Sequence, residues 1–159
     1  MNVLALDPAT RTGFAHSDGA SGTWNLSIRP GLPSGKRLVK LWAKLNEAAA
    51  VHGVDLIVFE EVRYIGTGYA RALIVQLELQ GALKLWCELR DVPFRAVGAP
   101  EVKKHATQKG NAKKEQMVAA ARRRWPDKDI TDDNEADALW ILDMATNPPK
   151  QPLFEEAQA

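Results

Sequence analysis

Two apolar runs that each end in a carboxylate constrain the fold of this sequence more than any other feature. Asn2–Asp7 reads NVLALD and Asp55–Glu61 reads DLIVFEE. Each run has the length of a strand, and strands that are apolar on both faces are typical of sheets covered by helices on two sides. We therefore expect two adjacent central strands in an α/β domain, with Asp7 and Glu60 close together where these strands end.

The remaining segments fit the same class. The alternating runs 13–16 and 22–26, separated by a Ser-Asp-Gly turn, predict a meander of antiparallel strands. Strands alternating with helices after such a meander predict an α/β layered domain with a mixed sheet. We expect one domain over residues 1–147 and a flexible C-terminal tail over 148–159. The further elements expected are a strand at 93–97 and helices near 36–52, 69–90, 101–106, 113–124 and 133–146.

Composition excludes several classes of protein. The chain has 159 residues and a single cysteine, Cys87, so it has no internal disulfide framework and no cysteine-rich zinc site. This usage suits a reducing cytosol. The N-terminus lacks the basic region of a signal peptide, and no apolar stretch approaches the roughly 20 residues of a membrane span. We expect a cytoplasmic protein.

The formal net charge of +1 conceals an uneven distribution. Residues 101–128 hold nine basic residues and three acidic ones, and residues 129–137 hold five acidic residues and no basic one. Basic segments of this kind bind nucleic-acid phosphates. The alternative, for Arg122–Arg124 in particular, is a solvated helix end that complements the helix dipole.

The acidic residues suggest a metal site. Asp137 lies on a predicted helix, with Asp133 and Asn134 one turn earlier on the same face. Oxygen donors from separate segments, without cysteine, describe a site for Mg²⁺ or Mn²⁺. Two such ions, about 3.5–4 Å apart, hydrolyse phosphodiesters in many nucleases. Taken singly, a strand-end aspartate is more often a turn cap, and Asp133 alone is most simply a first-turn acid.

The combination resembles the RuvC family of Holliday junction resolvases, in the ribonuclease H-like superfamily. The matching pieces follow the family's order: Leu4–Pro8 with Thr12–Ala15, Phe59–Val62, Val102-Lys103, Lys113–Gln116 and Glu135–Leu139. The resemblance implies a three-layer α/β/α fold with a mixed five-stranded sheet. It also implies a homodimer through the long helix, and a role in DNA recombination and repair. The short form and the divergence from cellular members suggest a phage or prophage member, in the cytoplasm of a bacterium or a phage-infected host.

The resemblance also implies the roles of individual residues. Asp7, Glu60 and Asp137 are the expected metal-binding and catalytic carboxylates, for two Mg²⁺ or Mn²⁺ ions in each active site. The family's fourth acid falls on Asn134, and Asp133 is the alternative ligand. Where cellular members carry a phenylalanine that stacks on junction bases, this chain has Arg63 and Tyr64. Lys114 is expected to be catalytic, and the expected DNA-binding residues are Arg63, Tyr64, Lys103, Lys104, Lys109, Lys113 and Lys114.

Two smaller features complete the predictions. His105, near these lysines, is expected to be exposed rather than to activate water. The tail residues Gln151, Leu153 and Phe154 resemble a peptide that binds the bacterial sliding clamp, although one spacer residue is missing. An untethered tail is the alternative interpretation.

The sequence therefore predicts a Mg²⁺- or Mn²⁺-dependent endonuclease that cuts four-way DNA junctions by paired nicks. Within the enzyme class, the alternative is a nuclease for flaps and other branched DNA or for RNA–DNA hybrids. From another class, the alternative is a catalytically weak junction-binding protein, if the fourth ligand is lost.

Overall fold

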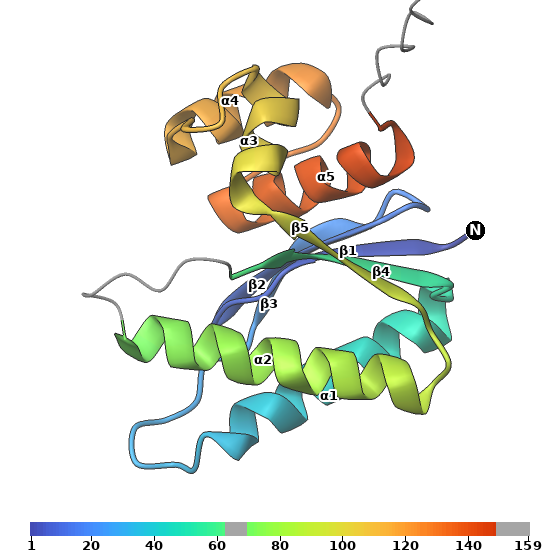
Figure 1. Ribbon diagram of the computed structural model, residues 1–159, viewed down its shortest axis with the longest axis vertical. Coiled ribbons are helices and arrows are strands. Elements are labelled where there is room, and N and C mark those ends of the chain that lie inside the picture. The colour runs from blue at the N-terminus through green and yellow to red at the C-terminus, as the bar shows by residue number, and fades with distance from the viewer. Residues whose placement is uncertain (63–69, 149–159) are drawn as a thin grey trace, which may run out of the picture.

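A computed structural model describes residues 1–62 and 70–148 of the chain (Figure 1). Each strand and helix expected from the sequence is present. The elements are β1 (Val3–Asp7), β2 (Arg11–His16), β3 (Ser21–Asn25), α1 (Gly35–His52), β4 (Leu56–Glu61), α2 (Ala70–Leu89), β5 (Phe94–Gly98), α3 (Ala99–Thr107), α4 (Lys114–Arg124) and α5 (Asp133–Thr146).

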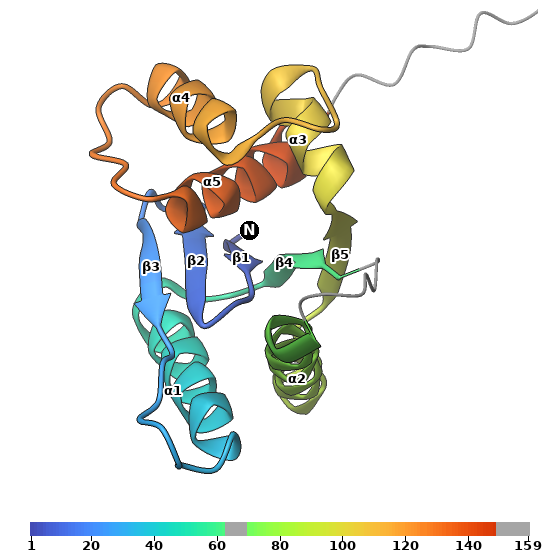
Figure 2. The same ribbon diagram turned by 90° about the vertical axis from the view of Figure 1, so that its left-hand side faces the viewer.

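The five strands form one mixed sheet in the order β3-β2-β1-β4-β5. Strands β1, β4 and β5 run parallel, whereas β2 pairs antiparallel with both β1 and β3. Figure 2 shows α3, α4 and α5 on one face of the sheet and α1 and α2 on the other. The fold is a three-layer α/β/α arrangement, because a central sheet that is apolar on both faces needs helices on both.

Alternation along the two central strands divides the core in two. Val3 and Ala5 of β1 pack with α5, whereas Leu4 and Leu6 pack with α1 and α2. In β4, Val58 belongs to the first core and Phe59 to the second. Because successive side chains of a strand point to opposite faces, Asp7 and Glu60 both point to the face that α5 covers.

The ends of α5 and of the sheet are joined by polar contacts. Asp132 caps α5 by accepting a hydrogen bond from the Glu135 backbone N–H at 2.9 Å. The same carboxylate accepts from the Thr23 hydroxyl of β3 at 2.9 Å. This cap fixes the first turn of α5 against the sheet, close to the end of β1. None of the helices in the described residues is long and apolar enough to span a membrane.

Candidate metal centre

Asp7 and Glu60 end adjacent parallel strands. Leu6 of β1 pairs with Phe59 of β4, so the next residue on each strand is the acid. Glu61, one residue further, turns to the other face and forms an ion pair with Lys84 of α2 at 3.7 Å. Glu60 is therefore the acid on the side of Asp7.

Gly13 allows α5 to bring its own acids to the same place. Gly13 of β2 pairs with Asp7, and a Cβ atom at this position would lie 1.8 Å from the backbone oxygen of Asn134. Only glycine permits this approach of strand and helix. The first turn of α5 therefore lies directly beside the end of β1.

These elements enclose a cavity of about 280 Å³ at the sheet edge. The predicted metal ligands and two of the predicted phosphate-binding lysines line this cavity. Its lining residues are Asp7, Ala9, Glu60, Gln76, Ala99, Lys103, Lys114, Met117, Asp133, Asn134 and Asp137. Segments that are far apart in the sequence thus meet as the strand-end argument predicts.

The three central carboxylates are held in surroundings that disfavour their charge. Burial, followed by the negative charges of Glu60 and Asp133, raises the pKa of Asp7 to about 7. Burial and Asp137 raise the pKa of Glu60 to about 7, and burial, Asp7 and Asp133 do the same for Asp137. The positive charges of Lys103 and Lys114 oppose these shifts only in part. Such a group of acids needs a cation to be stable in its charged form.

Asp133 already has a cationic partner. Lys114 Nζ lies 2.6 Å from its Oδ2, and this contact lowers the pKa of Asp133 and raises that of Lys114. The Asn134 side chain, by contrast, makes no hydrogen bond to any of the described residues. Its carbonyl oxygen is therefore unengaged at the wall of the cavity, one helical turn from Asp137.

The residues present fit a divalent metal. The polar side chains of the cavity wall offer carboxylate and amide oxygens beside two lysine amines, and hard cations such as Mg²⁺ and Mn²⁺ prefer such oxygens. The three carboxylates also line one cavity with raised pKa values, and a bound cation would reverse these shifts.

Comparisons with solved structures address the fold. Thermus thermophilus RuvC in complex with a Holliday junction substrate aligns with a TM-score of 0.71 and 23% identity, covering 89% of this chain and 90% of that one. The chain has the RuvC fold. A second Thermus thermophilus RuvC structure aligns at 0.66 with 23% identity and the same coverage. The yeast mitochondrial Holliday junction resolvase Ydc2 aligns at 0.57 with 16% identity, over 87% of this chain and 75% of that one.

This RuvC fold confirms the predicted three-layer α/β/α arrangement with a mixed five-stranded sheet. No family model matches the chain, and no curated protein matches its sequence. The likeness therefore lies in the arrangement of strands and helices, which the short motifs of the sequence already indicated.

Within the RuvC fold, the predicted DNA-binding residues divide into groups. Lys103 and Lys114 line the carboxylate cavity. Lys104 on α3, Lys109 in the following loop and Lys113 at the cap of α4 are exposed and lie outside the cavity lining. Arg63 and Tyr64 lie outside the described residues, as do the predicted clamp-binding residues Gln151, Leu153 and Phe154.

One prediction about this region is wrong. His105 is not a freely exposed side chain, because its Nε2 lies 2.8 Å from Asp143 Oδ2 and its side chain is only 14% exposed. Arg124 contacts the other oxygen of Asp143 at 3.2 Å. His105 therefore belongs to a network of side-chain contacts around Asp143 that joins α3, α4 and α5.

Sequence reasoning missed three residues near the centre. Gln80 of α2 is buried and donates a hydrogen bond to the backbone oxygen of Glu60 at 3.4 Å. Gln76, one turn earlier, lines the cavity, and Arg11 lines an adjoining cavity of about 490 Å³ that shares Gln76, Lys114, Asp133 and Asn134. Two glutamines four residues apart, on one face of α2, were the available signal for Gln76 and Gln80.

Proposed function

We propose that this chain is a metal-dependent endonuclease that resolves four-way DNA junctions by paired nicks, in DNA recombination and repair. The observation that carries the proposal is the convergence of Asp7, Glu60 and Asp137 with Lys103 and Lys114 around one cavity. The RuvC fold also supports a junction substrate, since one solved structure with that fold is a complex with a Holliday junction.

Two Mg²⁺ or Mn²⁺ ions are the proposed cofactors. Asp7, Glu60, Asp137 and Asn134 would hold them, with Asp133 as the alternative fourth ligand. When bound, two such ions supply an activated water nucleophile and stabilise the leaving oxygen of the phosphodiester. The raised pKa values of the three carboxylates support this assignment, because the ions would replace the protons that these groups otherwise hold near neutral pH.

Lys114 and Asp133 form an ion pair beside the three carboxylates. The Lys114 side chain is 78% exposed, and its only described ion-pair partner is Asp133. A solvent-exposed ion pair contributes little free energy, so the Lys114 ammonium can leave Asp133 and bind a phosphate oxygen at a small cost in free energy. We assign Lys114 to stabilising charge on the scissile phosphate, and Lys103, half-buried on α3, to a contact with the neighbouring backbone phosphate.

The exposed lysines around the cavity would extend the contact with DNA. Lys104, Lys109 and Lys113 have exposed side chains on the same side of the sheet as the carboxylates, on α3 and the segment leading into α4 (Figure 2). Lysines in such positions bind phosphates without sequence preference and make affinity dependent on salt. Arg63 and Tyr64, which follow β4, remain proposed contacts to the unstacked bases of the junction.

A homodimer is part of the proposal, because a four-way junction presents two equivalent cleavage positions. Ile74, Leu77 and Leu85 of α2 are 54%, 46% and 54% exposed, and their spacing places them in one stripe along the helix. Gly81 lies within this stripe, and a Cβ there would meet nothing within 4 Å. An apolar stripe with a glycine at its middle allows close approach of a second copy of α2.

A substrate panel tests the function. The wild-type protein and Asp7→Asn are incubated with a four-way junction, a flap, a linear duplex and an RNA–DNA hybrid, in Mg²⁺ and in Ca²⁺. The proposal predicts nicks confined to the junction in Mg²⁺ and none from Asp7→Asn. Asp129→Asn is the matched control. It removes an exposed acid of the acidic segment 129–137, and this variant should cut normally.

Other outcomes would select the alternatives. Equal cutting of the flap or of the RNA–DNA hybrid would indicate a nuclease of broader specificity. Junction binding by the wild-type protein without cleavage in any divalent metal would indicate a binding protein that has lost its fourth ligand.

A further inference from the structure

A second cluster of metal-ligating side chains lies away from the carboxylates. His16 ends β2, Asp18 lies in the turn to β3, and His52 is the last residue of α1. One ligand atom from each residue lies within 4.8 Å of the other two. Within residues 1–62 and 70–148, this is the only group of three histidine, cysteine or acidic residues that meets this condition.

His16 is already oriented as a metal-binding histidine would be. Its side chain is 1% exposed, and its Nε2 lies 2.9 Å from the backbone oxygen of Gly53. A carbonyl oxygen only accepts, so Nε2 carries the hydrogen and the lone pair is on Nδ1. Metal-binding histidines characteristically donate their second ring N–H to a carbonyl or carboxylate, which fixes the tautomer and the ring.

The Nδ1 atom of His16 faces both the backbone and the carboxylate of Asp18. Its Nδ1 accepts a hydrogen bond from the Asp18 backbone N–H at 3.1 Å and also lies 2.9 Å from Asp18 Oδ1. Two acceptors at this distance repel unless a cation, either a proton or a metal ion, lies between them.

Asp18 is suited to bridge the two histidines. Its second oxygen, Oδ2, lies 2.5 Å from His52 Nδ1. The backbone N–H of Ala20 donates to Asp18 Oδ1 at 2.9 Å and, with the two histidines, holds the pKa of this carboxyl well below its usual range. The carboxylate therefore stays charged and can ligate over the whole physiological pH range.

We propose that His16, Asp18 and His52 form a second metal site, for Zn²⁺ or another divalent transition ion that prefers nitrogen ligands. Two imidazoles and one carboxylate are a ligand set of zinc, whereas Mg²⁺ prefers oxygen alone. Three protein ligands leave the fourth position of a tetrahedral ion open. The histidines line a cavity of about 260 Å³ that offers room for a water or a small ligand there.

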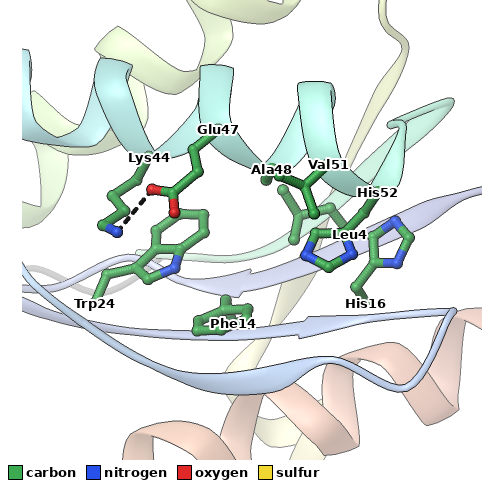
Figure 3. Close-up of a pocket in the computed structure, with 9 residues that line it drawn as sticks. All are labelled: Leu4, Phe14, His16, Trp24, Lys44, Glu47, Ala48, Val51 and His52. Carbon is green, nitrogen blue, oxygen red and sulfur yellow. Dashed lines mark hydrogen bonds and ion pairs between the residues drawn. The ribbon is translucent and has the colours of Figure 1, made fainter.

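Figure 3 shows this cavity between α1 and the sheet. The rings of His16 and His52 lie side by side at one end, with centroids 5.0 Å apart, and Trp24, Lys44 and Glu47 lie toward the other. The bound ion would tie the β2–β3 turn to the last turn of α1. Its expected effect is greater stability, because the unfolded chain cannot bring these three residues together.

The site is separate from the carboxylate cavity. His16 pairs with Leu4 near the start of β1, whereas Gly13 pairs with Asp7 at its end. Three residues of strand, roughly 10 Å, therefore separate the two sites along β1. Their donor sets also differ, so each can be examined without the other.

Co²⁺ is the probe for the test, because tetrahedral Co²⁺ with nitrogen ligands absorbs visible light strongly and octahedral Co²⁺ with oxygen ligands does so weakly. The Asp7→Asn protein, with a weakened carboxylate site, is titrated with Co²⁺ and then with Zn²⁺. We expect one strongly absorbing Co²⁺ per chain, displaced by Zn²⁺. Zinc should also raise the melting temperature by several degrees.

Single substitutions locate the ion. His52→Gln and Asp18→Asn, at partly exposed positions, should weaken binding by more than the roughly 10- to 100-fold that loss of a ligand's hydrogen-bonding partner costs. His105→Gln replaces the third histidine of the chain and should bind as the parent does. Absence of the strong absorption, or its persistence in both His52→Gln and Asp18→Asn, would overturn the proposal and leave a hydrogen-bonded triad held by a proton.

Discussion

The backbones of Gly13 and Asn134 are in direct contact, so close that a Cβ on Gly13 would lie 1.8 Å from the Asn134 carbonyl oxygen. This contact joins β2 to the first turn of α5 beside Asp7, the partner of Gly13 in the sheet. The relative placement of the strand acids and the helix acids therefore depends on one missing side chain.

Gly13→Ala tests this dependence. The methyl group must push α5 away from the sheet, and a displacement of about 1 Å in a catalytic centre can cost roughly 100-fold in rate. We expect junction cleavage to fall by at least about that factor, with a lower melting temperature. Gly35→Ala is the control, because a Cβ on Gly35 meets nothing within 4 Å and should leave both unchanged. Full activity of Gly13→Ala would show that the contact does not position the site.

The three raised pKa values predict how metal-free stability depends on pH. Asp7, Glu60 and Asp137 hold their protons up to about pH 7 when folded, against 3.8 to 4.5 ordinarily. Their contribution to folding is complete below pH about 4 and is lost as pH rises to about 7. In EDTA, the melting temperature of the wild-type protein should therefore fall relative to that of Asp7→Asn as the pH rises from about 4 to about 7.

Magnesium should reverse this loss. Since the ion binds the charged carboxylates, its stabilisation should be greatest above pH about 7, and 1 kcal/mol corresponds to roughly 2–4 °C for a chain of this size. Thermal unfolding with and without Mg²⁺ measures the effect, with Asp129→Asn as a control that follows the wild type. If the difference in melting temperature between the wild-type protein and Asp7→Asn did not change with pH, the assigned pKa shifts would be contradicted.

Asn134 and Asp133 can be separated by substitution. The Asn134 side chain makes no hydrogen bond to the described residues, whereas Asp133 is held by Lys114 at 2.6 Å. We therefore expect Asn134→Ala to reduce the single-turnover cleavage rate at fixed Mg²⁺ strongly, by more than about tenfold. Asp133→Ala should cost less. The reverse order would transfer the fourth ligand position to Asp133.

The exposed stripe of α2 predicts the oligomeric state. Leu85→Glu places a charge in the proposed contact and should weaken the dimer at least about tenfold, equivalent to about 1.4 kcal/mol, in sedimentation measurements. Val39→Glu, at a similarly exposed apolar residue of α1, should leave the dimer intact. A wild-type protein that stays monomeric at all concentrations would exclude this dimer.

The sequence was most informative where pattern and chemistry coincide. Asp7 and Glu60 could be placed together because each ends an apolar strand, and Asp137 because its helix follows in the expected order. Contacts made across long sequence distances were not predictable. The close approach of Gly13 to Asn134, the Gln80 contact with Glu60 and the pairing of His105 with Asp143 depend on how elements pack.

The cluster of His16, Asp18 and His52 was likewise not predictable from the sequence. His16 and Asp18 are two residues apart, but His52 reaches them only because α1 returns along the sheet and ends beside the β2–β3 turn. No local spacing in the sequence signals this site. Such spacing identifies metal ligands only when they lie on one element or one loop.

Paired nicking of a four-way junction can be followed strand by strand. A junction labelled in turn on each of its four strands is cut by the wild-type protein in Mg²⁺ under single-turnover conditions. We expect nicks at symmetric positions on two opposite strands, and none with Asp7→Asn. Nicks at unrelated positions on all four strands, or equal cutting of linear duplex, would contradict this expectation.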